Sequence, residues 1–140
     1  MLLPWTAASV ALARQRLAAD LSAEGIFEAT AGNAVLVVSE LLSNAIQHAR
    51  PLPGANVQVA WAFGRDAIEV AVSDGGSPTR PARTHASVSA LGGRGLDIVE
   101  HVSSNWGVRS DDSGQTVWAV VAAPARWRRP SREPAQSRTG

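Results

Sequence analysis

Three polar side chains of a predicted long helix are spaced so that they could do chemistry together. Glu40, Asn44 and His48 follow one another at intervals of four residues, so they lie along one flank of a helix. A carboxamide oxygen is a hard ligand suited to Mg²⁺, and a carboxylate one turn away can accept a proton from a water or a hydroxyl. The spacing fits a metal and general-base site, and an ordinary solvated flank has the same spacing.

Two glycine segments could approach a ligand closely. Asp74, Gly75 and Gly76 follow an apolar run. They form either a simple turn or a site where a carboxylate accepts a hydrogen bond from an exocyclic amine and glycine lets a ring approach the backbone. The second segment, residues 91–96, precedes a predicted helix. Glycines at a helix start expose N–H groups that favour anions, and a flexible hinge is the alternative.

The composition excludes several reactive groups. All thirteen basic residues are arginine, and lysine and cysteine are both absent. Without lysine there is no P-loop lysine, no lysine of the protein-kinase fold and no Schiff base. Without cysteine there is no disulfide, thiol nucleophile or cysteine-based zinc site. Any nucleotide site in this chain must therefore use neither of the two commonest phosphate-binding designs.

The positive charge is concentrated at one end of the chain. Residues 126–140 hold five arginines and one acid, which gives +4, whereas residues 1–125 hold eight arginines and eleven acids, which gives −3. We expect residues 1–125 to form one domain and residues 126–140 to be a disordered Arg/Pro-rich tail. The domain lacks the basic stripe that direct nucleic-acid binding needs. No signal peptide or membrane span is evident, so we expect a cytoplasmic protein.

The sequence pattern predicts the helices and strands that must position these polar groups. We predict helices at 6–21 and 27–49, a strand hairpin at 57–62 and 67–72, a long loop or lid from 74 to 92, a helix at 96–102, and strands at 106–109 and 115–122. This order predicts an α+β, two-layer α/β sandwich, with a mixed or antiparallel sheet covered by helices on one face. We expect no strand before the first helix.

Both long helices should bury an apolar face. The first carries a loose stripe at Val10, Leu12, Leu17 and Leu21. On the second, apolar residues fall within one arc next to the polar line when each residue is advanced by about 100°. The predicted members of that arc are Ala34, Val35, Val38, Leu41, Leu42, Ala45, Ile46 and Ala49.

Each of these signals is weak alone, but their order and spacing together are specific. The runs at 39–49, 72–76, 93–99 and 114–118 resemble those of the GHKL ATPase/kinase superfamily. Within it, the chain is most similar to the anti-sigma-factor serine/threonine-kinase-like ATP-binding proteins of actinobacteria. The resemblance covers about residues 5–122. It implies the Bergerat-type ATP-binding fold, with ATP and Mg²⁺ held between the helices and the sheet under a lid.

The resemblance also implies roles for individual residues. Glu40 corresponds to the general base, Asn44 to the Mg²⁺ ligand, and His48 to a position near the phosphates. Asp74 corresponds to the aspartate that accepts a hydrogen bond from the adenine amino group, with Gly76 beside the ring. Two further elements, which complete the implied ATP site, are the second glycine box and a threonine that holds adenine, namely Gly93, Arg94, Gly95, Leu96 and Thr116.

Two functions of different classes follow from the resemblance. The first is a serine/threonine kinase that phosphorylates a serine of an anti-anti-sigma-type partner, with Glu40 as the base. The second is a non-catalytic, nucleotide-gated module that sequesters a sigma factor or another regulator. Either could form a homodimer. A sensor histidine kinase fragment is a third reading, disfavoured because no helix pair with a phosphoacceptor histidine is evident.

Overall fold

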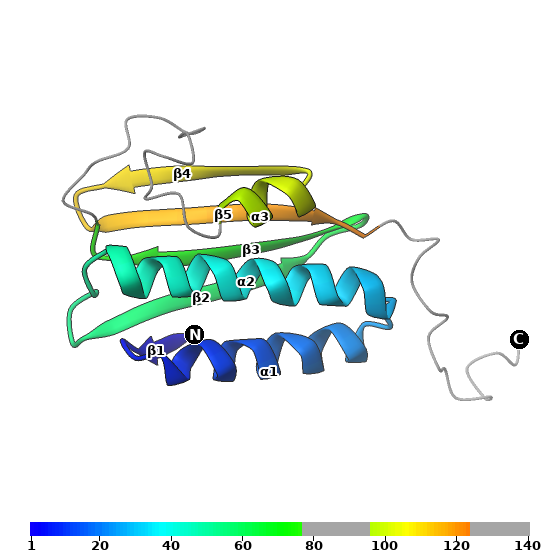
Figure 1. The fold of residues 1–140 in the computed structure, drawn as a ribbon, viewed down its shortest axis with the longest axis horizontal. Helices are drawn as coiled ribbons and strands as arrows, with labels where there is room; N and C mark the ends of the chain where they lie inside the picture. The colour runs from blue at the N-terminus through cyan, green and yellow to red at the C-terminus, as the bar shows by residue number, and fades with distance from the viewer. Residues whose placement is uncertain (77–95, 124–140) are drawn as a thin grey trace, which may run out of the picture.

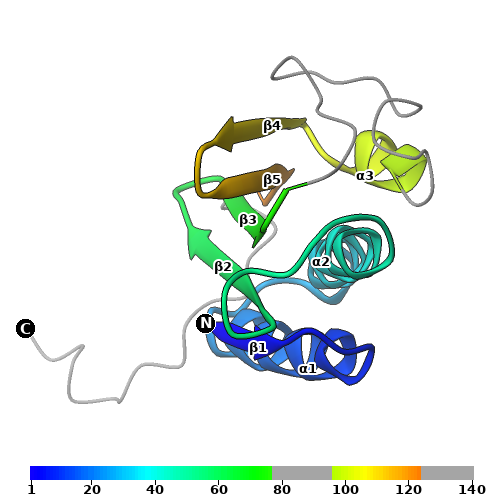
Figure 2. The same cartoon turned by 90° about the vertical axis from the view of Figure 1, so that its left-hand side faces the viewer.

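The computed structural model describes residues 1–76 and 96–123 and contains one sheet covered on one face by helices (Figure 1). Its elements run in the order β1 (Leu2–Pro4), α1 (Ala8–Ala23), α2 (Glu28–His48), β2 (Asn56–Phe63), β3 (Ala67–Asp74), α3 (Leu96–Val102), β4 (Asn105–Asp111) and β5 (Gly114–Ala122). The end-on view in Figure 2 places α1, α2 and α3 on the same side of the sheet. The predicted α+β sandwich is confirmed.

The sheet is wholly antiparallel, with strand order β1-β2-β3-β5-β4. The predicted hairpin is β2–β3, and the last two strands form a second hairpin that adds β5 to the free edge of β3. Because side chains alternate across a strand, the helix-facing positions of β3 and β5 are apolar through most of their length. Their buried members are Ile68, Val70, Val72, Ala119 and Val121.

The expectation that no strand precedes the first helix is wrong. Leu2–Pro4 pairs with β2 in antiparallel register, Leu3 opposite Val57, and forms one edge of the sheet. Three residues that end in proline carry no readable alternation, so pairing with β2 rather than local pattern makes them a strand. Proline is tolerated there because an edge strand leaves one side without a hydrogen-bonded neighbour.

Helix α1 buries only part of the predicted stripe, namely Leu17 and Leu21. Ser9, Ala13, Leu17 and Leu21 are buried, and the hydroxyl of Ser9 donates to the carbonyl of Pro4 at 2.6 Å. Leu12, by contrast, is 36% exposed. The buried residues repeat every four positions. Small residues such as serine and alanine are buried among them because α1 packs closely on α2. Helix α1 ends where Gly25 adopts a positive φ of 73°, a common C-terminal conformation.

Helix α2 is the centre of the helical layer. Its buried residues are Thr30, Ala34, Val37, Val38, Leu41, Leu42 and Ala45, so the predicted arc is shifted toward Val37, and Val35 and Ile46 are only half-buried. Length and hydropathy alone would let this helix cross a membrane. Here its apolar face packs against α1, α3 and the sheet, which accounts for the apolar composition.

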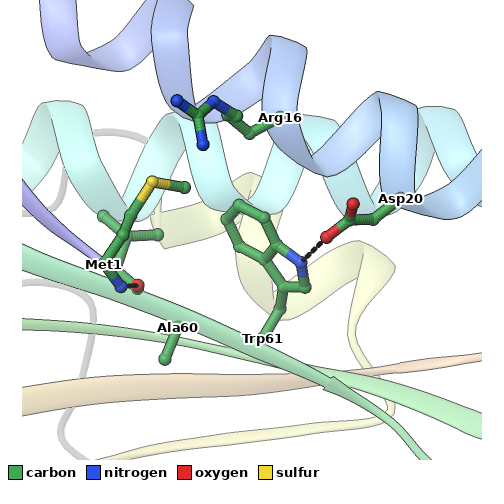
Figure 3. Close-up of a pocket in the computed structure, with 6 residues that line it drawn as sticks. Met1, Arg16, Asp20, Ala60 and Trp61 are labelled. Atoms are coloured by element: carbon green, nitrogen blue, oxygen red, sulfur yellow. Dashed lines mark hydrogen bonds between the residues drawn. The ribbon is translucent and has the colours of Figure 1, made fainter.

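Helix α1 is also held to the sheet by a hydrogen bond between two side chains. The indole Nε1 of Trp61 on β2 donates to the Asp20 carboxylate on α1 at 2.8 Å (Figure 3). Tryptophan can bury its ring while its N–H reaches a polar partner at the margin. This bond holds α1 over β2, at the side of the sheet farthest from β4.

Replacing Leu17 by alanine should destabilise the protein far more than the same change at Leu12. Leu17 is fully buried, so Leu17→Ala should lower the free energy of unfolding by about 2–5 kcal/mol. Leu12→Ala, one and a half turns earlier on the same helix, should cost less than about 1 kcal/mol. Urea unfolding of both variants measures the difference. Equal losses would contradict the placement of the α1 stripe.

Candidate functional site

The end of α2 is fastened to the end of β3 by backbone hydrogen bonds. The Arg50 N–H donates to the Gly76 carbonyl at 2.8 Å, and the Gly75 N–H donates to the Arg50 carbonyl at 2.7 Å. A side chain at Gly75 would overlap the carbonyl of Pro51, so only glycine permits this approach. The C-terminal end of α2, which carries Asn44 and His48, is thereby held beside the Asp74 end of β3.

A small pocket with both polar and apolar lining residues lies at this junction. One wall comes from α2 and the other from the paired ends of β3 and β5. Its lining residues are Leu41, Asn44, Ala45, His48, Ala49, Asp74, Gln115 and Val117. The cavity volume is about 30 Å³. Chain segments far apart in the sequence therefore bring three of the predicted residues, Asn44, His48 and Asp74, to one place.

A second hollow shares a wall with this pocket. It has a cavity volume of about 230 Å³ and is lined by the residues after α2, the glycines after Asp74 and the β4–β5 turn. Its named members are Arg50, Gly75, Gly76, Ser110, Asp111, Asp112, Gly114 and Gln115. Gln115 lines both hollows. Ligand pockets for small molecules usually measure about 300–1,000 Å³, so a nucleotide needs both spaces or a shift of the side chains between them.

Asp74 is a buried carboxylate with an unusual affinity for protons. Only 1% of the residue is exposed, and its Oδ1 accepts a hydrogen bond from the Gly76 N–H at 2.7 Å. Burial raises the pKa of Asp74 to about 6, an effect that the bond from Gly76 partly offsets. Gly76 makes this bond with a positive φ of 100°, which glycine adopts without strain. The carboxylate is therefore costly to the fold at neutral pH, as is typical of functional groups.

Asn44 carries an oxygen without a partner. Its Oδ1 is buried and makes no hydrogen bond with the residues that the structure describes. A buried acceptor left unpaired costs about 1–3 kcal/mol, so its presence in a pocket wall points to a ligand. Glu40 lies one helical turn before Asn44 and is half-buried, and it does not line the pocket. His48 lies one turn after Asn44 and is exposed at the pocket rim.

The structure places Thr116 on the wrong face of the sheet for the predicted role. Its Oγ1 is hydrogen-bonded to the Ser73 hydroxyl at 2.7 Å, on the face that carries no helices. Its neighbour Gln115 pairs with Asp74 in the β3–β5 register and enters the pocket. The expectation that Thr116 holds adenine with Asp74 is corrected on this ground. Strand alternation was the available signal, because only residues of the right parity share a face.

The second glycine box is described only at its last residue. Gly93, Arg94 and Gly95 lie outside the described residues, as do the predicted lid and tail. Leu96 begins α3, and its side chain is fully buried in the core. Its side chain therefore stabilises the packing of α3 and is not in contact with the pocket.

A larger hollow on the opposite side of the helical layer contains none of the predicted residues. Figure 3 shows it between α1 and β2, where Met1, Arg16, Asp20 and Trp61 surround a space of about 360 Å³. Its Asp20 and Trp61 side chains are hydrogen-bonded to each other. We place the functional site at the smaller pocket, because unsatisfied buried polar atoms indicate a ligand better than volume does.

A protein-family model matches nearly the whole of the described fold. The family model described as histidine kinase-like ATPase domain matches residues 3–121, which includes every element of the structure except the first residue of β1 and the last residue of β5. The comparison with curated proteins returned no match.

The buried Asp74 should make the protein less stable as pH rises. Its pKa is about 6 in the folded protein against 3.8 for the ordinary group, so the folded state holds the proton more tightly than the unfolded chain. The contribution of Asp74 is therefore most favourable below pH 4 and is lost as pH rises through 6, by up to about 3 kcal/mol. Urea unfolding between pH 4 and 7, compared with Asp74→Asn, isolates this contribution. Parallel pH profiles for the two proteins would contradict it.

Proposed function

Because the chain belongs to the histidine kinase-like ATPase domain family, we propose that it binds ATP with Mg²⁺ at the junction of α2, β3 and β5. The observation that carries the proposal is the Oδ1 of Asn44, which has no hydrogen-bond partner among the described residues. It lies on the pocket wall that faces the buried carboxylate of Asp74. The Asn44 oxygen suits a cation, and the Asp74 carboxylate suits a hydrogen-bond donor. ATP carries both, as an Mg²⁺-bound triphosphate and an exocyclic amine.

The donor set fits a metal ion that arrives with the nucleotide. The described residues contain no group of three or more histidine, aspartate or glutamate side chains that could hold a metal by themselves. Mg²⁺ is commonly held by one or two protein oxygens together with water and substrate phosphates. We propose Asn44 as the protein ligand. When bound, Mg²⁺ would neutralise charge on the phosphates, and Asp74 would hold the adenine amino group beside Gly76.

We further propose that the chain is a serine/threonine kinase acting on an anti-anti-sigma-type protein. Glu40, one turn from Asn44, would accept the proton of the partner's serine hydroxyl. The serine oxygen would then form a bond to the γ-phosphorus while the bond from that phosphorus to the β–γ bridging oxygen breaks, which releases ADP. Such catalysis depends mostly on positioning and on stabilising charge. The resemblance to anti-sigma-factor kinases supports this choice of partner, and a cytoplasmic location agrees with it.

One observation favours the non-catalytic alternative. Glu40 is half-buried and lies outside the pocket lining, so a general base does not face the site directly. In that alternative the protein would be a nucleotide-gated module that sequesters a sigma factor or another regulator, and phosphoryl transfer would be absent. A homodimer is compatible with both the kinase and the binding module.

Replacing Asn44 by alanine should weaken Mg-ATP binding by at least tenfold. The change removes the proposed metal ligand, and it also removes an unpaired buried oxygen, so the fold should be kept or slightly stabilised. Isothermal titration calorimetry with Mg-ATP measures the affinity. Gln47→Ala, on the exposed side of the same helical turn, is the matched control and should bind normally. An unchanged affinity in Asn44→Ala would refute the metal-binding role.

Replacing Glu40 by glutamine should separate binding from chemistry. Glu40→Gln should bind ATP normally and lose phosphoryl transfer by about 10²–10⁴-fold, the usual contribution of a general base. Transfer of radiolabel from ATP to candidate anti-anti-sigma partners recovered by ATP-dependent pull-down measures the activity. Glu69→Gln, on the helix-free face of β3, is the control. If the wild type labels none of the recovered partners, the kinase proposal is lost and the binding module remains.

A further inference from the structure

A groove between α1 and α2 lies on a part of the surface that the proposed nucleotide site does not use. Its larger part has a cavity volume of about 460 Å³ and its smaller part about 340 Å³, and Ala18 and Val35 line both parts. We call the two parts together the α1–α2 groove. We propose that residues 124–140 of the same chain dock in this groove, with their arginines beside Glu24 and Glu28.

The floor of the groove is left open by a glycine that the described fold does not require. Gly32 lies inside α2, is exposed and lines the larger part of the groove. A glycine inside a helix costs about 0.5–1 kcal/mol relative to alanine. A Cβ atom at Gly32 would meet no atom within 4 Å, so no neighbour among the described residues accounts for its absence. A segment that packs against α2 from outside would occupy the space that glycine leaves.

The charge around the larger part of the groove is acidic. Residues 17–49 include four acidic side chains and no arginine. Glu28 lines the groove in the first turn of α2, where the helix dipole favours a negative charge. Glu24 is the C-cap of α1, and the last turn of that helix has no basic residue. Because the C-terminal end of a helix favours a cation, Glu24 is the carboxylate that an arginine from elsewhere would compensate.

The segment after β5 carries the complementary charge and leaves the fold at the same end of the molecule. Residues 124–140 hold five arginines and one acid, which gives +4. The N–H of Ala123 donates to the Asp66 carbonyl at 2.8 Å, which holds the end of β5 at the β2–β3 turn. The bond from Trp61 to Asp20 places the end of α1 near the same turn, as Figure 1 shows.

The segment is long enough to reach any point of the groove. Residues 124–140 span at most about 60 Å when extended, whereas α2, with 21 residues, is about 32 Å long. A single exposed ion pair contributes at most about 1 kcal/mol, so one contact would not hold the segment. Because the segment belongs to the same chain, however, its local concentration is about millimolar, and several weak contacts together can keep it in place.

A spin label on the segment tests the docking in the full chain. The chain has no cysteine, so Ser131→Cys provides a single attachment site. We expect the label to cause loss of intensity in the amide NMR signals of Gly25 and Gly32, which line the groove. The signals of Ala62 and Glu69, on the helix-free face of the sheet near the same end, should keep their intensity. Reduction of the label should restore every signal.

Charge neutralisation separates docking from mere proximity. Adding Glu24→Gln and Glu28→Gln to the labelled chain should restore the signals of Gly25 and Gly32. The matched control adds Asp97→Asn and Glu100→Gln, which remove the same charge from α3, and should leave the losses unchanged. Raising the salt concentration to about 1 M, where the Debye length is about 3 Å, should act like the neutralised groove. The amide spectrum of each variant with reduced label establishes that it is folded.

Three results would overturn the inference. The first is equal loss of intensity on the groove and on the helix-free face, and the second is a loss at Gly25 and Gly32 that persists in the neutralised groove. The third is a loss that also appears when labelled chain without isotope is mixed with isotope-labelled chain that carries no spin label, because the segment would then contact a second copy. None of these results depends on ATP, since the groove and the nucleotide pocket lie toward opposite ends of α2.

Discussion

The antiparallel register between β3 and β5 is the constraint on which the rest of the site depends. It places Asp74 opposite Gln115 and Ser73 opposite Thr116. The first pair therefore enters the pocket, and the second forms a hydrogen bond on the other face. A slip of one residue in β5 would exchange these faces and expose the apolar residues of the strand. Burial of Ala119 and Val121 against the helices thus also fixes the chemistry at the end of the strand.

Helix α2 contributes both to the core and to the site. Its apolar side faces the core, and its neighbouring polar side faces the pocket. Its apolar side is buried against α1, α3 and the sheet, and its polar line runs along the margin of that contact. The margin is the place where Asn44 can be buried enough to lose water yet near enough to a cavity to meet a ligand. The Oδ1 of Asn44 has no partner among the described residues, and the carboxylate of Asp74 is costly at neutral pH because burial raises its pKa to about 6. A ligand that satisfies both groups would stabilise the protein on binding.

The sequence predicts most of the fold because most elements have a clear period. The central helix is predicted within one residue of its ends, and the β2–β3 hairpin follows from alternation around a short turn. The first strand is missed because three residues that end in proline have no alternation to read. Leu12 is misplaced because Ser9 and Ala13, which hydropathy counts as weak, join Leu17 and Leu21 in the buried stripe of α1. These errors arise where a neighbouring element, rather than local pattern, decides what is buried.

The sequence places some residues of the candidate site correctly and one of them on the wrong face of a strand. Asn44, His48 and Asp74 are brought together as their motifs imply, because each motif is tied to one end of a regular element. The motif assigned Thr116 to the site, whereas the structure places Gln115 in the pocket. A motif specifies the order of residues and not the face of the strand on which each one lies. Counting parity from Asp74 across the paired strand would have identified Gln115. That count requires knowing that β3 and β5 are neighbours, although the hairpins suggest only β2–β3 and β4–β5.

The pairing of β3 with β5 also sets when the pocket can exist during synthesis. Ser73 and Thr116, bonded across this ladder, are 43 residues apart in the chain, whereas both hairpins close over short turns. Pairings that are distant in sequence form late, because the entropy of closing the loop must be lost before their contacts are gained. A nascent chain released as far as α3 would hold Asn44 and Asp74 but lack the second strand wall. Ligand recognition is thus acquired with the last strand, so a truncated translation product would contain the motif helix without a working site.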